Sequence, residues 1–167
     1  LVNPKLVLTS DTLKYNTFSK IATILGPSNI VSDNNHIYSE RGFYNTLSEQ
    51  AELLDRSILT NDGKKLIGDS LFYDRKVGYG EAFDNIRMTD TINKNMLTGN
   101  YCFYNELTDS AFATKRAVAI DYSQGDSLFM HGDTLQLISY NLNTDSVFRL
   151  MKAYHKVRMY RTDVQGV

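Results

Sequence analysis

A motif that ends in Tyr-Asn or Tyr-Asp recurs along the chain, and its period limits the folds that the chain can adopt. Tyr15, Tyr44 and Tyr73 are 29 residues apart, Tyr104 follows after 31, and Leu137 takes the same position after a further 33. A unit of this length cannot bury its apolar face alone, so the units must stack on one another. The sequence therefore predicts a single repeat-built domain over residues 1–167, with about five units.

Two further columns keep the same phase. A small residue lies seven positions after each tyrosine and an apolar residue lies fifteen positions after it. The small column is Ala22, Ala51, Gly80 and Ala111, and the apolar column is Ile30, Leu59, Met88 and Ala119. Small residues stacked in a column predict a narrow seam where two sheets approach each other, on the side opposite a wider tyrosine ladder. The expected shape is thus a folded-over sheet that is tight on one side.

The segments between the turns favour strands over helices. Around each tyrosine, large apolar residues alternate with polar ones, which is typical of half-buried strands. Asn61–Gly63 and Gln124–Asp126 have the composition of hairpin turns. Residues 144–157 are the best remaining helix candidate, because Val147, Leu150, Met151 and Tyr154 have helical spacing, while the phase of the repeat makes a strand equally consistent with the sequence. The fold class expected is all-β.

The segment KIATILGPSNIVSDNNHIYSERGFYN, residues 20–45, resembles the repeat of the OstA family of lipopolysaccharide-transport proteins. The matching positions are Ala22, Gly26, Ile30, Val31, Ile37, Glu40, Tyr44 and Asn45. LIGDSLFYD and VRMYRTDVQGV follow the same pattern, whereas Asp55 and Asp84 replace the usual turn glycine in two units. The resemblance implies a twisted, antiparallel β-jellyroll that is open along one side and built from repeats of about 29 residues.

The resemblance also implies a function. Proteins of this kind are non-enzymatic carriers in the periplasm of Gram-negative bacteria, where an apolar groove shields the acyl chains of lipopolysaccharide on the way to the outer membrane. The expected ligand is lipopolysaccharide or another acylated lipid. The expected partners are further copies joined end to end, or related jellyroll proteins of the transport bridge. A signal peptide is absent from this sequence, and the ending RTDVQGV reads like the start of a further unit, so we expect the natural chain to continue.

The repeat also assigns candidate residues. The groove candidates are Leu13, Tyr15, Ile24, Tyr44, Leu53, Leu71, Tyr73, Ala82, Tyr104 and Leu137. The candidates for end-to-end contacts lie in a first strand over residues 5–11 and a last strand over residues 155–162, and they are Leu6, Val7, Leu8, Val157, Met159 and Tyr160. An aspartate at Leu53 or Tyr73 is expected to weaken lipid binding, whereas Lys64→Asp, placed on the surface, is expected to leave it unchanged.

Composition argues against several other functions. The 18 basic and 19 acidic residues form no basic stripe, so nucleic acid is not an expected partner. No apolar run is long enough for a transmembrane segment. The three histidines lack a second ligand at metal spacing, and the single Cys102 has no adjacent base, so neither a metal, a cofactor nor a catalytic thiol is expected.

Two other hypotheses remain open. A structural or adhesive β-solenoid that binds protein or glycan would have a closed, dry core. A solenoid enzyme that degrades polysaccharide would have one carboxylate cluster on one face. The acidic residues of this chain recur with the repeat, whereas an active site occurs once, so we expect no enzymatic activity. The carrier predicts a continuous apolar groove and open strand edges.

Overall fold

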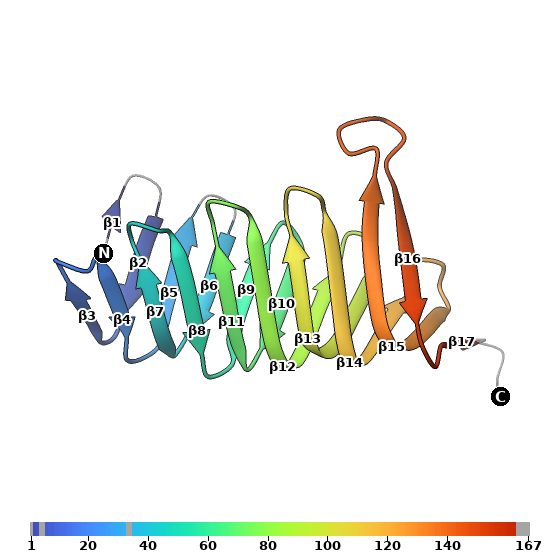
Figure 1. Ribbon diagram of the computed structural model, residues 1–167, viewed down its shortest axis with the longest axis horizontal. Coiled ribbons are helices and arrows are strands. Elements are labelled where there is room, and N and C mark those ends of the chain that lie inside the picture. Colours follow the sequence, from blue (N-terminus) through green and yellow to red (C-terminus); the bar gives the residue numbers. More distant parts are fainter. Residues whose placement is uncertain (1, 4–5, 33–34, 163–167) are drawn as a thin grey trace.

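The computed structural model describes residues 2–3, 6–32 and 35–162, which form one antiparallel sheet of 17 strands without any helix (Figure 1). The sheet is folded over into two layers, here called front and back. The predicted all-β fold is confirmed, and the helical alternative for residues 144–157 is wrong because residues 148–154 form a strand.

Short strands make up the N-terminal part of both layers. The front layer contains β3 (Leu13–Asn16), β4 (Ile21–Ile24), β7 (Arg41–Asn45), β8 (Gln50–Leu54), β11 (Ser70–Asp74) and, at the other end, β16 (Phe148–Tyr154). The back layer contains β1 (Val2–Asn3), β2 (Leu6–Ser10), β5 (Ser28–Ser32), β6 (Asn35–Ser39), β9 (Ser57–Asn61), β10 (Lys64–Gly68) and β17 (Arg158–Thr162).

Four longer strands run through both layers. They are β12 (Tyr79–Asp90), β13 (Asn95–Asn105), β14 (Ser110–Asp121) and β15 (Ser127–Tyr140). The pairing register shifts in the middle of β12, β13 and β14, and these irregularities bend each strand from one layer into the other. One side of the fold is therefore a line of corners that joins the layers, and the opposite side, here called the mouth, carries hairpin turns that stay within one layer (Figure 1).

The turns on the front side of the mouth explain why each tyrosine is followed by Asn or Asp. The side-chain oxygen of this residue accepts hydrogen bonds from the backbone N–H groups two and three positions later, at 2.9 to 3.4 Å. The four residues are Asn16, Asn45, Asp74 and Asn105. This local hydrogen bonding ends the strand and starts the turn, so the repeated dipeptide marks the mouth.

The corner side contains the narrow seam, and it is formed by other residues than the sequence predicted. Ser28 donates a 2.6 Å hydrogen bond to Ser10, and Ser39 and Ser57 lie 3.0 Å apart, all at the corner. Gly68 follows in register with Ser57. The prediction that the Ala22 column forms the seam is wrong, because those residues pair with the tyrosines within the front layer.

From residues 55–56 onward, every second corner contains two consecutive residues with positive φ. These pairs are Asp55–Arg56, Asp84–Asn85, Lys115–Arg116 and His155–Lys156. Asp and Asn enter this region more readily than most residues. The two departures from the family's turn glycine, Asp55 and Asp84, therefore fit the same backbone.

Gly42 provides a test of the packing between adjacent front strands. A Cβ atom at Gly42 would overlap the carbonyl oxygen of Glu52 and lie 3.0 Å from the Cα of Leu53, whereas a Cβ at Gly80 would lie 3.6 Å from its nearest neighbour. We expect Gly42→Ala to lower the free energy of unfolding by about 1 to 3 kcal/mol, as overpacking does. Gly80→Ala should change it by no more than about 0.5 kcal/mol. Urea unfolding of the two variants measures the difference, and equal stabilities would contradict this description of the packing.

Candidate functional site

Two apolar rows face each other between the layers and run the length of the molecule. Cross-strand pairing connects the members of each row. The back row is Leu8, Ile30, Ile37, Leu59, Leu66, Met88, Leu97, Ala119, Met130 and Met159. The front row is Leu13, Ile24, Gly42, Leu53, Leu71, Ala82, Cys102, Ala113, Leu135 and Ala153. The interior is therefore a continuous apolar strip bounded by both layers.

A second front row lies nearer the mouth, and it interleaves the tyrosines with the small residues. Ala22 pairs with both Tyr15 and Tyr44, and Ala51 pairs with both Tyr44 and Tyr73. The row continues through Gly80, Tyr104, Ala111 and Leu137. A small residue beside each tyrosine leaves space for the ring in the same layer, which is why the two columns share one phase.

The interior is filled at the N-terminal end and hollow in the middle. Near β2 and β5, only about 10 Å³ remains between Leu6, Ile30 and Tyr44. Further along, a cavity of about 240 Å³ lies between the layers. Its walls include Leu53, Leu59, Leu66, Leu71, Tyr73, Met88 and Tyr104. The two layers thus enclose an apolar space that begins near β8 and reaches the mouth.

The back edge of the mouth is polar. Asn35, Asn61, Lys64 and Asp90 follow one another in cross-strand register. Asn61 donates a 2.6 Å hydrogen bond to Asn35. In cross-section the interior is apolar at depth and polar at its opening, which suits a ligand with an apolar and a polar part.

The tips of the front turns carry exposed apolar side chains. Phe18 is 96% exposed, Leu47 72% and Leu107 75%, each two positions after the Asn that ends its strand. Lys76 takes this position after Asp74, so three of the four units share the apolar column, which could have been found from the sequence on the basis of its phase.

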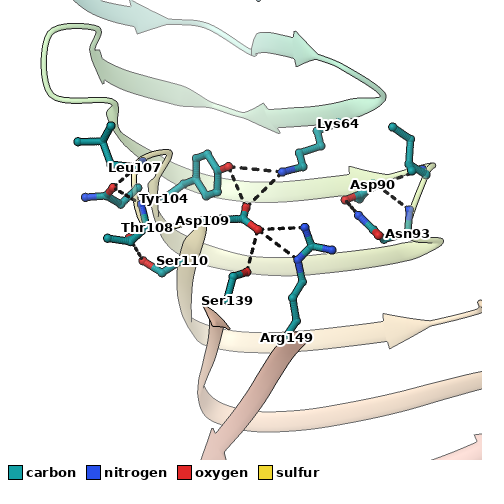
Figure 2. Close-up of polar contacts among 12 residues, drawn as sticks. Lys64, Asp90, Asn93, Tyr104, Leu107, Thr108, Asp109, Ser110, Ser139 and Arg149 are labelled. Atoms are coloured by element: carbon teal, nitrogen blue, oxygen red, sulfur yellow. Dashed lines mark hydrogen bonds and ion pairs between the residues drawn. The ribbon is translucent and has the colours of Figure 1, made fainter. Parts of the chain in front are cut away.

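A cluster of polar residues spans the mouth above the cavity, here called the Asp109 cluster (Figure 2). Lys64 of the back layer lies 3.3 Å from the Asp109 carboxylate and donates a 3.4 Å hydrogen bond to the Tyr104 hydroxyl. Ser139 donates to Asp109 at 2.8 Å, and Arg149 donates to it at 3.0 and 3.2 Å. Side chains from three distant parts of the sequence therefore hold one carboxylate.

The electrostatics of this cluster favour its charged form. Burial opposes ionisation of Asp109, but the hydrogen bonds from Ser139 and Arg149, with the charge of Lys64, lower its pKa to about 2. Burial likewise disfavours the charged Lys64, yet its contacts with Tyr104 and Asp109 leave its pKa raised. The cluster is thus a charged network at neutral pH.

The structure places most of the predicted groove residues inside. Ile24, Tyr44, Leu53, Leu71, Tyr73 and Ala82 are buried, and Leu13, Tyr104 and Leu137 are partly buried. Tyr15, on the outermost front strand, is 37% exposed. The expectation that Lys64 is a surface residue is wrong, because Lys64 is half-buried and points into the mouth toward Tyr104 and Asp109, whereas its neighbour Lys65 is exposed.

The predicted contact residues divide into two groups. Leu6 and Leu8 are buried among the core residues, while Val7, Val157, Met159 and Tyr160 are exposed. Part of the predicted first strand, including Lys5, lies outside the described residues. β1 pairs with Leu6 and Val7 of β2, so this half of β2 is covered.

The rest of the described chain contains little that is reactive. No three His, Cys, Asp or Glu side chains converge on a metal position within the described ranges. Burial raises the pKa of the Cys102 thiol to about 12. Within the same ranges there is no helix that could cross a membrane.

Comparison with known proteins agrees with the fold. Residues 1–62 match the family described as OstA-like protein. A similar solved structure is LptH from Pseudomonas aeruginosa, described as the LptA-homologous periplasmic component of the lipopolysaccharide transport device. The similarity has a TM-score of 0.60 at 10% identity, and covers 66% of this chain and 82% of LptH. A search of curated proteins found no match. The resemblance predicted from the sequence is therefore confirmed: residues 1–62 match the OstA-like family, and the chain adopts a β-jellyroll fold similar to that of LptH.

Proposed function

We propose that this protein is a non-enzymatic periplasmic carrier of lipopolysaccharide, which holds the acyl chains between its two layers on the way to the outer membrane. The observation that carries the proposal is the pair of apolar rows with a cavity of about 240 Å³ between them and a polar edge at the mouth. Such a cross-section suits an amphiphile whose chains enter the interior and whose headgroup stays at the opening.

The cavity also favours the carrier over the structural solenoid, for which a closed, dry core was expected. Burial of acyl chains contributes roughly 0.8 kcal/mol per methylene, so such a groove needs no strong polar anchor. The match of residues 1–62 to the OstA-like family and the likeness of the fold to periplasmic LptH support the periplasmic location.

The proposal includes association with other jellyrolls. The outermost strands of the described array are β3 with the uncovered half of β2, and β16 with β17. Edge strands present backbone N–H and C=O groups to which a further strand can pair. A second copy, or a related jellyroll of a transport bridge, would extend both layers and the apolar strip between them.

The binding test uses two adjacent residues of β10. Leu66 lines the cavity, whereas Ile67 points to the opposite face of the same strand. Leu53 and Tyr73 are less suitable, because Leu53 is fully buried and an aspartate there would threaten the fold. We expect Leu66→Asp to weaken binding of fluorescently labelled lipopolysaccharide at least tenfold, since a buried leucine side chain is worth about 1.5 to 3 kcal/mol.

Ile67→Asp is the matched control and is expected to change the affinity by less than about twofold, since the half-buried Ile67 side chain lies on the face of β10 away from the cavity and does not line it. Circular dichroism and thermal unfolding establish that both variants are folded. Equal binding by the two variants, or equal loss, would count against ligand binding between the layers.

A further inference from the structure

The layers are connected through the backbone at the corners, whereas at the mouth the described residues hold them together through side chains. The hairpin between β9 and β10 joins strands of the back layer, and the turn at residues 105–110 joins strands of the front layer. Lys64 begins β10 and reaches across this gap to Tyr104 and Asp109 (Figure 2). Opening the mouth therefore requires this contact to break while the corners stay intact.

The front side of the contact does not depend on Lys64. Asp109 remains bound by Ser139 and by two nitrogen atoms of Arg149 at 2.8 to 3.2 Å. Its carboxylate therefore keeps its position and charge when Lys64 leaves.

Lys64 has a second carboxylate within its own layer. Asp90 is its cross-strand partner on β12 and is 4% exposed. The Asp90 carboxylate is fixed by the backbone N–H groups of Ile92 and Asn93 and by the Asn93 amide, at 2.6 to 3.0 Å. Burial opposes ionisation of Asp90, but the hydrogen bonds from Asn93 outweigh the burial and lower its pKa. The charge of Lys64 lowers this pKa further. Lys64 thus lies between two fixed carboxylates, one in each layer (Figure 2).

The contact across the mouth is weak enough to exchange. Its distances are 3.3 and 3.4 Å, and the Lys64 side chain is 30% exposed. Partly exposed ion pairs of this kind contribute little to stability, and a minor state of such an equilibrium is readily populated. Lys64 and Tyr104 both line the cavity, so movement of Lys64 changes the access to it.

We propose that Lys64 is a latch for lateral loading. Bound to Asp109 and Tyr104, it closes the mouth over the cavity; turned toward Asp90, it opens the mouth and an acyl chain enters from the side instead of from the end of the groove. The inference rests on the proposed function, because it needs an interior that accepts acyl chains.

The first experiment compares Lys64→Gln with Lys94→Gln, an exposed lysine in the back-layer turn between β12 and β13 that does not line the cavity. The rate at which labelled lipopolysaccharide is taken up is followed by fluorescence. Lys64→Gln is expected to load about two to five times faster, the range that one partly exposed ion pair supports. Lys94→Gln is expected to load at the wild-type rate. Equal rates for both variants and the wild type would overturn the latch.

The second experiment locks the mouth. Cysteines at Lys64 and Asp109, in a Cys102→Ala background, are joined by a short bis-maleimide. The locked protein is expected to load at least about tenfold more slowly than the same protein before cross-linking, since a covalent link removes the open state that loading needs. Unchanged loading would show that the acyl chains enter from the end of the groove. That result would overturn the inference while leaving the carrier function intact. Failure of the wild-type protein to bind lipopolysaccharide would instead overturn the proposed function and the latch with it.

Discussion

Replacing Asp109 by asparagine is expected to lower the free energy of unfolding by about 2 kcal/mol at pH 7. The carboxylate is 16% exposed and is bound by Ser139, Arg149, Tyr104 and Lys64. Its pKa is about 2, compared with an ordinary 3.8. Each pKa unit of this difference corresponds to about 1.4 kcal/mol by which the folded protein stabilises the charged carboxylate. An asparagine keeps the shape of the side chain but loses the charge, and urea unfolding at pH 7 measures the loss.

The effect should depend on pH. A carboxyl group with a lowered pKa stabilises the fold above its ordinary pKa, and this contribution disappears as the pH falls toward its pKa in the folded protein. The difference between the wild type and Asp109→Asn should therefore be full above about pH 5 and shrink between about pH 4 and pH 2. Asp133→Asn is the control, because Asp133 is 54% exposed and lies 3.8 Å from Lys156. A difference that does not change with pH would contradict the charged network.

Labelling of Cys102 by a soluble aromatic disulfide is expected to be at least about a thousandfold slower in the folded protein than in urea. The thiolate is the reactive form, and a pKa near 12 instead of an ordinary 9.0 leaves about a thousandth of the usual thiolate at neutral pH. The side chain is also 2% exposed and lies in the front apolar row between Ala82 and Ala113. Absorbance of the released thiol measures the rate.

The protein unfolded in urea, assayed at the same pH, provides the reference rate for an accessible thiol. Rapid labelling under native conditions would mean that the layers separate far enough at β13 to admit the reagent. Slow labelling alongside rapid uptake of lipid would mean that loading leaves this part of the front row closed.

The periodic features of the fold could be predicted from the sequence. Tyr15, Tyr44, Tyr73 and Tyr104 do occupy equivalent places in successive units, and strands with hairpin turns occur where the repeat predicts them. The reason is that a repeat of nearly constant length brings equivalent residues into one row, whatever the details of packing. The apolar interior followed from the same columns.

The relation between different columns could not be predicted in this way. The sequence suggested that the small residues face the tyrosines across the fold, whereas the strand register places Ala22 and Ala51 beside them in the front layer. Strand register depends on the whole set of buried contacts and turns. The narrow seam is instead made at the corners by residues such as Ser28 and Ser39, where each strand passes from one layer to the other.

The candidate site divides in the same way. The inward direction of Leu53, Leu71 and Tyr73 is a property of period and alternation, and it was determined by the sequence alone. The Asp109 cluster was decided by tertiary structure. Lys64 and Arg149 do not recur with the repeat, and they reach Asp109 from 45 and 40 residues away in the sequence. A contact made once has no period, so only the folding of the two layers over each other brings these charges together at the mouth.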